Sequence, residues 1–449
     1  MRVVVIGADA CGASAASGVK RALGDEAEVV VLERQPWTSY SACGIPYWVA
    51  GDVEGPDVLV ARTPDQHRAN GLDLRTGWEA VGLDISARTV KAVAPGWGRE
   101  ETLEYDHLVI GTGAVPLRPP IPGSDLPGVH GVQTIDDGLR VLDSLHRQPE
   151  RVVVVGAGYI GIEMAEAMCT RGLEVTVVDK APAPMTTLDP DMGALIATAM
   201  TGMGISYRGG EPVQRIDAAE SGRAAAVVTE AARYPADLVV LGLGVRPNTD
   251  LALAAGLPLG EFGGLLTDDR MEVLDHPGVW AGGDCVEVVD RITGDRRHVA
   301  LGTHANKHGR VIGTNIAGGD LRFPGVVGTA VSKICELEIS RVGLREAEAR
   351  ELGMDVVAAT IKASTRAHYF PGAGPVHVKM IAEKGTGRVR GCQIVGQAGA
   401  GKRIDVAATA IWNEMTAEQV TSLDLAYAPP FSPVWDPVQI AARKLAGMV

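Results

Sequence analysis

The sequence lacks any long hydrophobic run. Nowhere in its 449 residues do about 18 apolar residues follow one another, the length that a membrane-spanning helix needs. The first residues, MRVVVIGADA, hold a short apolar run that ends at a glycine turn, which is not the pattern of a secretion signal. We therefore expect no membrane partner and a cytoplasmic location.

Positive charge is also scarce. Lys and Arg number 42 against 55 Asp and Glu, which gives a net charge of −13. A surface that binds nucleic acid or an anionic membrane carries an excess of basic groups, so no nucleic-acid partner is expected. A few local cations can still bind a small anionic ligand.

The six cysteines form no C-x-x-C pair and no metal-ligand spacing, so neither a metal site nor a disulfide framework is predicted. Most free cysteines are buried structural thiols. One differs in its setting: the stretch SYSACGIPY, residues 39–47, places Cys43 in a short segment punctuated by glycine and proline. In a reducing compartment a functional cysteine is more often catalytic than structural.

Glycine, by contrast, is abundant, with 56 residues that cluster between valine-rich runs. This pattern is typical of an α/β protein with tight phosphate-binding turns, and the length predicts two or three domains. Residues 3–33 contain a strand, a glycine turn, a small-residue helix and a second strand ending in Glu33. Residues 152–179 repeat the plan and end in Asp179. Each is a βαβ unit of the length that a dinucleotide fold requires.

The two glycine turns are not equally complete. The second has all three glycines, whereas Asp9 stands at the middle position of the first. Glycine allows a pyrophosphate to approach the N-terminus of the following helix, and the terminal acid accepts hydrogen bonds from the ribose hydroxyls. Asp179 would repel a 2′-phosphate, which favours NADH; the adjacent Lys180 weakens this preference and leaves NADPH as the alternative.

Two more stretches point to nucleotide binding. Residues 106–116, DHLVIGTGAVP, predict a strand that ends in a Gly-Thr-Gly turn, and residues 278–285, GVWAGGDC, predict a strand that runs into Gly283 and Asp284. An acid at such a place is often only a helix N-cap. Together with the N-terminal unit, it is better explained as a ligand contact at the carboxyl edge of a sheet.

In this order the motifs resemble the flavin-dependent pyridine nucleotide–disulfide oxidoreductases over nearly the whole chain. The resemblance implies an α/β fold with two Rossmann-like domains, for FAD and NADH, the second inserted in the first, and an α+β C-terminal dimerisation domain. The implied boundaries are 1–113 and 247–325 for the FAD domain, 114–246 for the NAD(P)H domain and 326–449 for the dimerisation domain. The stretch VGTAVSKICELEISRVGL, residues 327–344, is similar to the start of the last domain.

The resemblance also implies the cofactor-binding residues. For FAD they are Gly7, Gly12, Glu33, Arg34, Thr112, Gly113, Gly283 and Asp284. For the nicotinamide nucleotide they are Gly156, Gly158, Gly161 and Asp179.

Cys43 matches the subgroup of this family that uses a single redox cysteine facing the flavin. This subgroup contains coenzyme A disulfide reductases, persulfide reductases, and NADH oxidases and peroxidases. We expect the start of a helix and the flavin to lower the pKa of Cys43 and to keep it as a thiolate. Oxidases and peroxidases of the subgroup carry a histidine where this sequence has Ala10, which weighs against both activities.

The C-terminal region resembles coenzyme A disulfide reductases most closely. Where other members of the family have a C-terminal His-Glu pair, these reductases have two tyrosines. The stretches AHYFPGAGP (367–375) and AYAPPFSPVWDP (426–437) match the two tyrosine motifs, with Tyr369 and Tyr427 at the tyrosine positions. Either hydroxyl could assist a leaving thiolate at Cys43 of the other subunit of a homodimer. Alternatively, each is an interface packing residue. Further expected substrate contacts are Ser39, Lys20, Arg21 and Arg62, with Arg68 as another candidate cation; charged residues at helix ends are usually only solvated.

The sequence thus predicts an FAD-dependent NAD(P)H:disulfide oxidoreductase that reduces coenzyme A disulfide or persulfide through Cys43. Two alternatives stay open. One is an NADH oxidase that passes electrons to oxygen, and the other is a redox-sensing flavoprotein that binds NADH without turnover.

Overall fold

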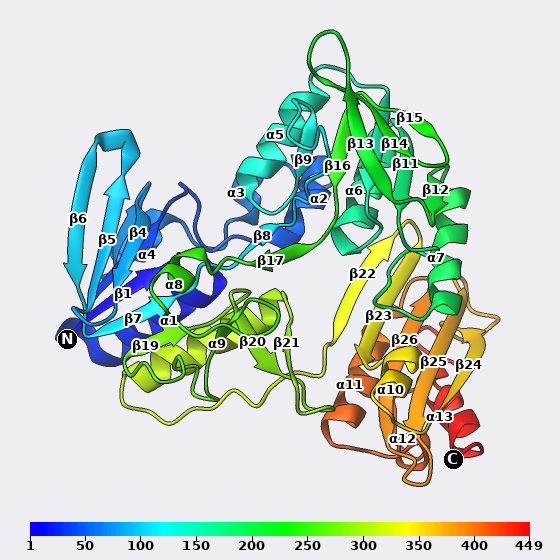
Figure 1. The fold of residues 1–449 in the computed structure, drawn as a ribbon. Coiled ribbons are helices and arrows are strands. Elements are labelled where there is room, and N and C mark those ends of the chain that lie inside the picture. Colours follow the sequence, from blue (N-terminus) through cyan, green and yellow to red (C-terminus); the bar gives the residue numbers. More distant parts are fainter.

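The computed structural model describes residues 1–449 and contains three large sheets (Figure 1). The first is parallel, with the strand order β19-β7-β1-β2-β3. Its strands and the elements around them are β1 (Arg2–Ile6), α1 (Ala10–Leu23), β2 (Glu28–Glu33), α2 (Ile45–Ala50), α3 (Pro56–Leu59), α4 (Pro64–Ala69), β3 (Asp73–Thr76), β4 (Glu79–Asp84), β5 (Thr89–Ala94), β6 (Arg99–Glu104), β7 (His107–Ile110), β18 (Leu265–Leu266), β19 (Val279–Ala281), β20 (Val286–Val289), β21 (Arg296–His298) and α9 (Gly302–Ile316).

A second parallel sheet, in the order β12-β11-β10-β16-β9, is built from chain that lies between β7 and β19. An antiparallel ribbon, β17 paired with β8, connects the two parts. The elements of this stretch are β8 (Ala114–Pro116), β9 (Val129–Gly131), α5 (Ile135–Leu145), β10 (Arg151–Val155), α6 (Tyr159–Thr170), β11 (Glu174–Asp179), α7 (Pro190–Gly202), β12 (Ser206–Gly209), β13 (Val213–Ala218), β14 (Ala224–Thr229), β15 (Arg233–Pro235), β16 (Leu238–Leu241), β17 (Val245–Pro247) and α8 (Asp250–Ala254).

The third sheet is antiparallel, in the order β22-β23-β26-β25-β24, with helices packed against it at the C-terminal end of the chain. Its elements are β22 (Ala330–Ile334), β23 (Leu337–Gly343), α10 (Glu346–Glu351), β24 (Val356–Ser364), β25 (Pro375–Glu383), β26 (Val389–Gly396), α11 (Ile404–Trp412), α12 (Ala417–Thr421) and α13 (Pro437–Ala446). The mixed α/β class, with two Rossmann-like sheets and a separate C-terminal sheet, is confirmed.

Valine-rich runs form the central strands because both faces of a parallel sheet are covered, so every residue must be apolar. In β1, Val3, Val4 and Val5 are fully buried, and Val5 lies opposite Val31 of β2 and Val109 of β7. The sheet therefore holds the ends of β1, β2 and β7 at one edge, where the glycine turn and Glu33 lie.

Two helices of the first part pack closely through glycine. A Cβ on Gly309 of α9 would lie 2.3 Å from the carbonyl oxygen of Cys11, and one on Gly313 would lie 2.7 Å from that of Ala15. This close approach brings the N-terminus of α9 next to the N-terminus of α1 at the same edge of the sheet.

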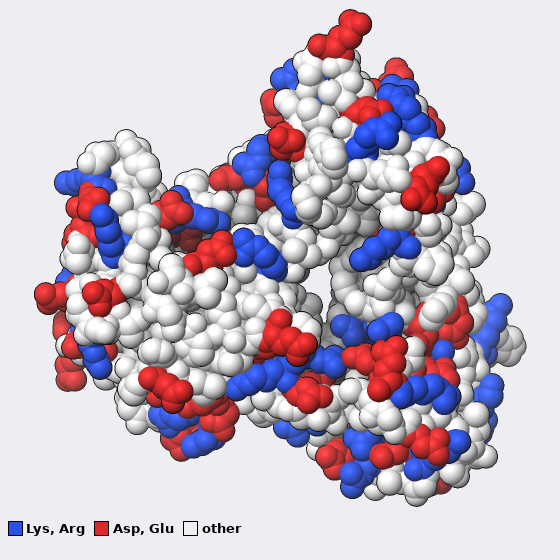
Figure 2. All heavy atoms as spheres, in the orientation of Figure 1, with Lys and Arg blue, Asp and Glu red and all other residues white.

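None of the helices is both long enough and apolar enough to span a lipid bilayer. On the face shown in Figure 2, Lys and Arg side chains alternate with Asp and Glu, and they form no continuous basic area.

Candidate active site

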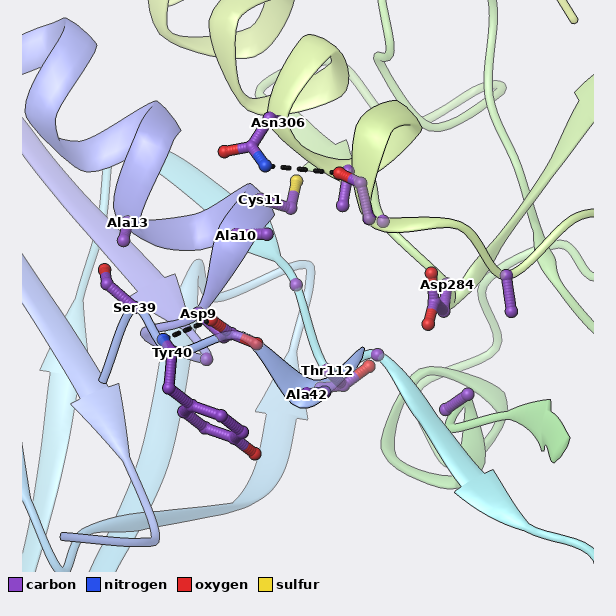
Figure 3. A pocket seen from close by; sticks show the side chains of 18 of the residues that line it. Asp9, Ala10, Cys11, Ala13, Ser39, Tyr40, Ala42, Thr112, Asp284 and Asn306 are labelled. Carbon is purple, nitrogen blue, oxygen red and sulfur yellow. Dashed lines mark hydrogen bonds between the residues drawn. The ribbon is translucent and has the colours of Figure 1, made fainter. Parts of the chain in front are cut away.

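One cavity of about 1780 Å³ runs along this edge and reaches all three parts of the chain. Pockets for drug-sized ligands have volumes of roughly 300–1,000 Å³, so this cavity has room for a dinucleotide and a second ligand. Of the residues expected to bind cofactor or substrate, the cavity is lined by Gly7, Ser39, Cys43, Glu33, Arg34, Arg21, Arg62, Thr112, Gly113, Gly158, Gly283 and Asp284. Figure 3 shows part of this wall.

The first glycine turn leaves no room for a side chain at Gly7 or at Gly12. Gly7 has a φ of +98°, and a Cβ there would lie 2.3 Å from the carbonyl oxygen of Gly111; one on Gly12 would lie 1.9 Å from the carbonyl oxygen of Gly7. Both glycines thus serve the close packing of turn, strand and helix. Thr112, on the neighbouring turn, donates from Oγ1 to the carbonyl oxygen of Asn248 at 2.6 Å, which joins this turn to the chain that returns after β17.

Glu33 ends β2 and faces the same turn. Its carboxylate accepts the N–H of Ala8 and that of Gln35, both at 2.9 Å, which leaves lone pairs for a ribose hydroxyl. Burial raises the pKa of Glu33. Burial also raises the pKa of Asp284, while His298 opposes the shift.

The second glycine turn repeats this geometry. Gly156 has a φ of +98°, and a Cβ on Gly161 would lie 2.0 Å from the carbonyl oxygen of Gly156. Asp179 accepts the N–H of Ala157 at 2.6 Å and that of Ala181 at 2.7 Å, as Glu33 does in the first unit. Only Gly158 of this set reaches the shared cavity; Gly156, Gly161 and Asp179 lie outside its wall.

Cys43 is exposed on the cavity wall, in a short 3-10 turn (Ala42–Gly44) directly before α2. The expected lowering of its pKa includes the effect of the flavin and stays a prediction; without the flavin, the surroundings of Cys43 shift its pKa in the opposite direction. Cavity walls displace water around the thiol, so burial raises the pKa of Cys43, and the carboxylates of Glu163 and Asp284 raise it further. Its own backbone N–H acts in the other direction.

Glu163 is a site residue that sequence reasoning missed. It lies on α6, lines the cavity and accepts a hydrogen bond from Ser332 Oγ of β22 at 2.7 Å. Burial raises its pKa, and the Ser332 bond opposes that shift. Its place two residues after Gly161 gave no signal, because glutamate is common on helices.

Ser39 is held by groups that the sequence did not connect with it. Its Oγ lies 2.9 Å from Nε2 of the buried His67, and its backbone has a φ of +46°, which is rare for a residue other than glycine. The N–H of Ser39 donates to the carbonyl oxygen of Ala8 at 3.1 Å. The Cys43 segment is thus fastened to the first glycine turn.

The expected cations differ in where they lie. Arg21 and Arg62 reach the cavity. Lys20 does not; its ammonium donates to Asp25 at 3.4 Å and to the carbonyl oxygen of Ala27. Arg68 is likewise engaged, with Asp65 and the carbonyl oxygen of Leu74.

Neither expected tyrosine lines the cavity of its own chain. Tyr369 is 68% exposed and Tyr427 is 47% exposed, and both lie in the C-terminal part. Nearby Phe431 is 77% exposed, which is unusual for a large apolar side chain.

The residues present fit an FAD molecule: a glycine turn at a helix N-terminus, an acid with free lone pairs at the end of the next strand, and a cavity long enough for a dinucleotide. A second such turn opens onto the same cavity, beside a single accessible cysteine. Fold and site together define an oxidoreductase that binds two dinucleotides.

Comparison with known proteins agrees. The family model "Pyridine nucleotide-disulphide oxidoreductase" matches residues 1–309, and the model for the dimerisation domain of that family matches residues 329–437. An NAD(P)H coenzyme A polysulfide/persulfide reductase from Pyrococcus horikoshii is 40% identical over 447 residues, covering 99% of this chain and 98% of the relative. An NADH oxidase from Methanocaldococcus jannaschii is 38% identical over 446 residues, covering 99% and 98%.

Among solved structures, a NAD-dependent persulfide reductase from A. fulgidus superimposes with a TM-score of 0.96 at 38% identity, covering 100% of this chain and 83% of that one. The chain belongs to the pyridine nucleotide–disulphide oxidoreductases. It is therefore an FAD-dependent oxidoreductase that uses NAD(P)H.

Proposed function

We propose that this protein reduces coenzyme A disulfide or a coenzyme A persulfide with electrons from NADH, through Cys43. The observation that carries the proposal is the position of this accessible thiol on a cavity that both glycine turns share. The persulfide reductases among its relatives support the substrate class.

We further propose which part of the chain binds each cofactor and which part forms the dimer interface. Residues 1–113 and 247–325 bind FAD, residues 114–246 bind NADH, and residues 326–449 form the dimer interface. The match of the dimerisation model supports the last assignment. Preference for NADH rests on Asp179, because a carboxylate at this place repels a 2′-phosphate.

Cys43 would act as the nucleophile. Its thiolate attacks one sulfur of the substrate disulfide, a mixed disulfide with Cys43 forms, and one thiolate leaves and takes up a proton. FAD, when bound, supplies a carrier that takes two electrons from NADH and delivers them to sulfur. The second thiol then leaves, and Cys43 is a thiolate again.

The remaining residues would bind and orient the substrate. Ser39 is held by His67 at the cavity wall, where its hydroxyl can contact the thiol of the substrate. Arg21 and Arg62 offer cations for the phosphates of coenzyme A. Lys20 is the weakest of the candidates that we named, because its ammonium pairs with Asp25 and lies outside the cavity.

We propose a homodimer in which Tyr427 and Tyr369 assist Cys43 of the partner subunit. The exposure of both tyrosines supports this arrangement, since a free surface rarely displays several large aromatic side chains. In this role a tyrosine hydroxyl donates a proton or a hydrogen bond to the leaving thiolate. Mixed dimers of a Cys43→Ser chain with a Tyr427→Phe chain would retain one site that has both groups.

The testing experiment is NADH oxidation under strictly anaerobic conditions, with and without coenzyme A disulfide. We expect fast turnover only with the disulfide, and loss of that turnover in Cys43→Ser. Cys169→Ser is the matched control, because Cys169 is also partly exposed but lies outside the cavity. Wild-type turnover in Cys43→Ser would refute the proposal.

The second candidate is an NADH oxidase. The relative from M. jannaschii favours it, whereas Ala10, in place of a histidine, weighs against it. NADH consumption that begins only when oxygen is admitted would support the oxidase. Flavin reduction by NADH without turnover on either acceptor would leave the redox-sensing alternative.

A further inference from the structure

Asp9 is the residue in which the first glycine turn departs from the second. Gly158 is the middle glycine of the second turn, and Asp9 has the same place in the first, as the N-cap residue of α1. Its side chain lines the large cavity, between Tyr40 and the turn that carries Thr112 (Figure 3). Glycine at this place lets a dinucleotide pyrophosphate approach the backbone, so a carboxyl group here faces the same region.

The contacts of Asp9 anchor its carboxyl group but do not neutralise it. Oδ1 accepts the backbone N–H of Tyr40 at 3.2 Å. The titratable groups that face Asp9 are Glu33 from the end of β2, Asp284 from the turn after β19, and Tyr40 and Cys43 from the neighbouring segment. All of these neighbours are acids, so none of them brings a positive charge to Asp9.

This environment favours the neutral form of the carboxyl group. Burial raises the pKa of Asp9 to about 6, the Tyr40 N–H opposes the shift, and Glu33 and Asp284 add to it. A dinucleotide that binds at the N-terminus of α1 brings a diphosphate, which carries further negative charge to the same place. Like charges in one site force one group to take up a proton.

We propose that FAD binding to this protein is coupled to the uptake of one proton by Asp9. In the complex, the protonated carboxyl group keeps its acceptor bond to Tyr40 and gains an O–H donor on the side of the cavity. The proposal depends on FAD binding, which the family shows, and not on the identity of the disulfide substrate.

The sign of the effect follows from linkage. The pKa of Asp9 is higher in the complex than in the FAD-free protein, so FAD affinity is full below the lower pKa and falls as pH rises between the two. In this range the dissociation constant increases by about tenfold per pH unit for one linked proton.

The test uses full-length protein from which FAD has been removed. Titration with FAD, followed by quenching of flavin fluorescence, gives the dissociation constant from pH 5.5 to 8.5. Calorimetry at pH 7.5 in buffers with different ionisation enthalpies counts the protons. We expect uptake of nearly one proton per FAD in the wild type and none in Asp9→Asn, which keeps an acceptor for the Tyr40 N–H.

Two further variants make the outcome decisive. Asp9→Gly restores the middle glycine and is expected to remove the pH dependence in the same way. It replaces Asp9→Asn in the test if the Asn variant folds poorly. Asp125→Asn changes an exposed aspartate outside the cavity and should retain the wild-type slope and proton count.

Zero proton uptake in the wild type would overturn the proposal. So would an equal slope in wild type and Asp9→Asn, since another group would then carry the proton. None of these measurements involves a disulfide, so a failure here leaves the proposed function intact, and a failure of disulfide reduction leaves this inference intact.

Discussion

Lys379 on β25 pairs with three carboxylates, those of Asp189 and Asp191 at the start of α7 and that of Glu346 on α10. Its ammonium lies 3.2 Å from Asp189, 3.0 Å from Asp191 and 3.2 Å from Glu346. The side chain of Lys379 is 8% exposed and that of Asp189 is 4% exposed, so both charges are withdrawn from water. Lys379→Met keeps most of the length of the side chain and removes the positive charge that balances the three carboxylates.

The loss of unfolding free energy in Lys379→Met depends on which carboxylates are left without a partner. Breaking a buried ion pair by removing one partner costs about 3–5 kcal/mol. Asp191 is 49% exposed and Glu346 retains Arg350 at 2.8 Å, so neither loses much. Asp189 keeps the N–H of Glu346 at 3.2 Å and the amide of Gln393 at 2.7 Å. We therefore expect the lower end, about 3 kcal/mol.

The assay is unfolding in guanidinium chloride at pH 7 with saturating FAD, followed by tryptophan fluorescence, in which the midpoint shift times the slope gives the change in unfolding free energy. The matched control is Lys384→Met, because Lys384 pairs with Asp355 at 3.1 Å but the two side chains are 49% and 72% exposed. That change should cost less than about 1 kcal/mol. Equal losses in the two variants would refute the argument from burial.

The same cluster has a defined pH dependence. Arg350 first, and Lys379 after it, lowers the pKa of Glu346 below its ordinary value. A lowered folded-state pKa gives stability that is full above the unfolded-state value and is lost as pH falls through the folded-state value. The difference between wild type and Lys379→Met should thus be largest near neutral pH and shrink in acid.

Two further predictions concern the site. In Gly161→Ala the new Cβ meets the carbonyl oxygen of Gly156 at 2.0 Å, so the KM for NADH should rise by roughly tenfold or more with FAD content unchanged. The control is Gly202→Ala, whose Cβ meets nothing within 4 Å and which should leave that KM unaltered. An unchanged KM in both variants would refute this account of the turn. In Glu163→Gln a carboxylate that raises the pKa of Cys43 is removed, so alkylation of Cys43 below its pKa should accelerate by roughly twofold to threefold, whereas slower alkylation would contradict the assigned sign.

The two nucleotide turns could be predicted because their determinants are local. The chain must turn sharply between a buried strand and a helix, and only glycine permits the φ of +98° at Gly7 and Gly156. The acids Glu33 and Asp179 follow at a distance set by one βαβ unit, so the sequence alone indicates which residues meet each turn.

The protonation of Cys43 could not be predicted in this way. A helix start close to the cysteine suggested a lowered pKa, yet α2 begins only at Ile45, and Glu163 arrives from a helix more than a hundred residues further along the chain. Burial and Coulomb interactions depend on distance in space, which the order of residues does not give.

What the sequence by itself determined is therefore a set of local units. Two glycine turns and two terminal acids are fixed by backbone sterics and strand–helix geometry, and one cysteine stands apart from the others in the sequence. Only the tertiary structure decided which of them share a cavity, that Lys20 is bound to Asp25 while Arg21 reaches the cavity, and that Asp9 faces the carboxylates of Glu33 and Asp284. These outcomes depend on long-range packing, because the energy of a charge is set by whichever segments the fold brings within a few ångströms of it.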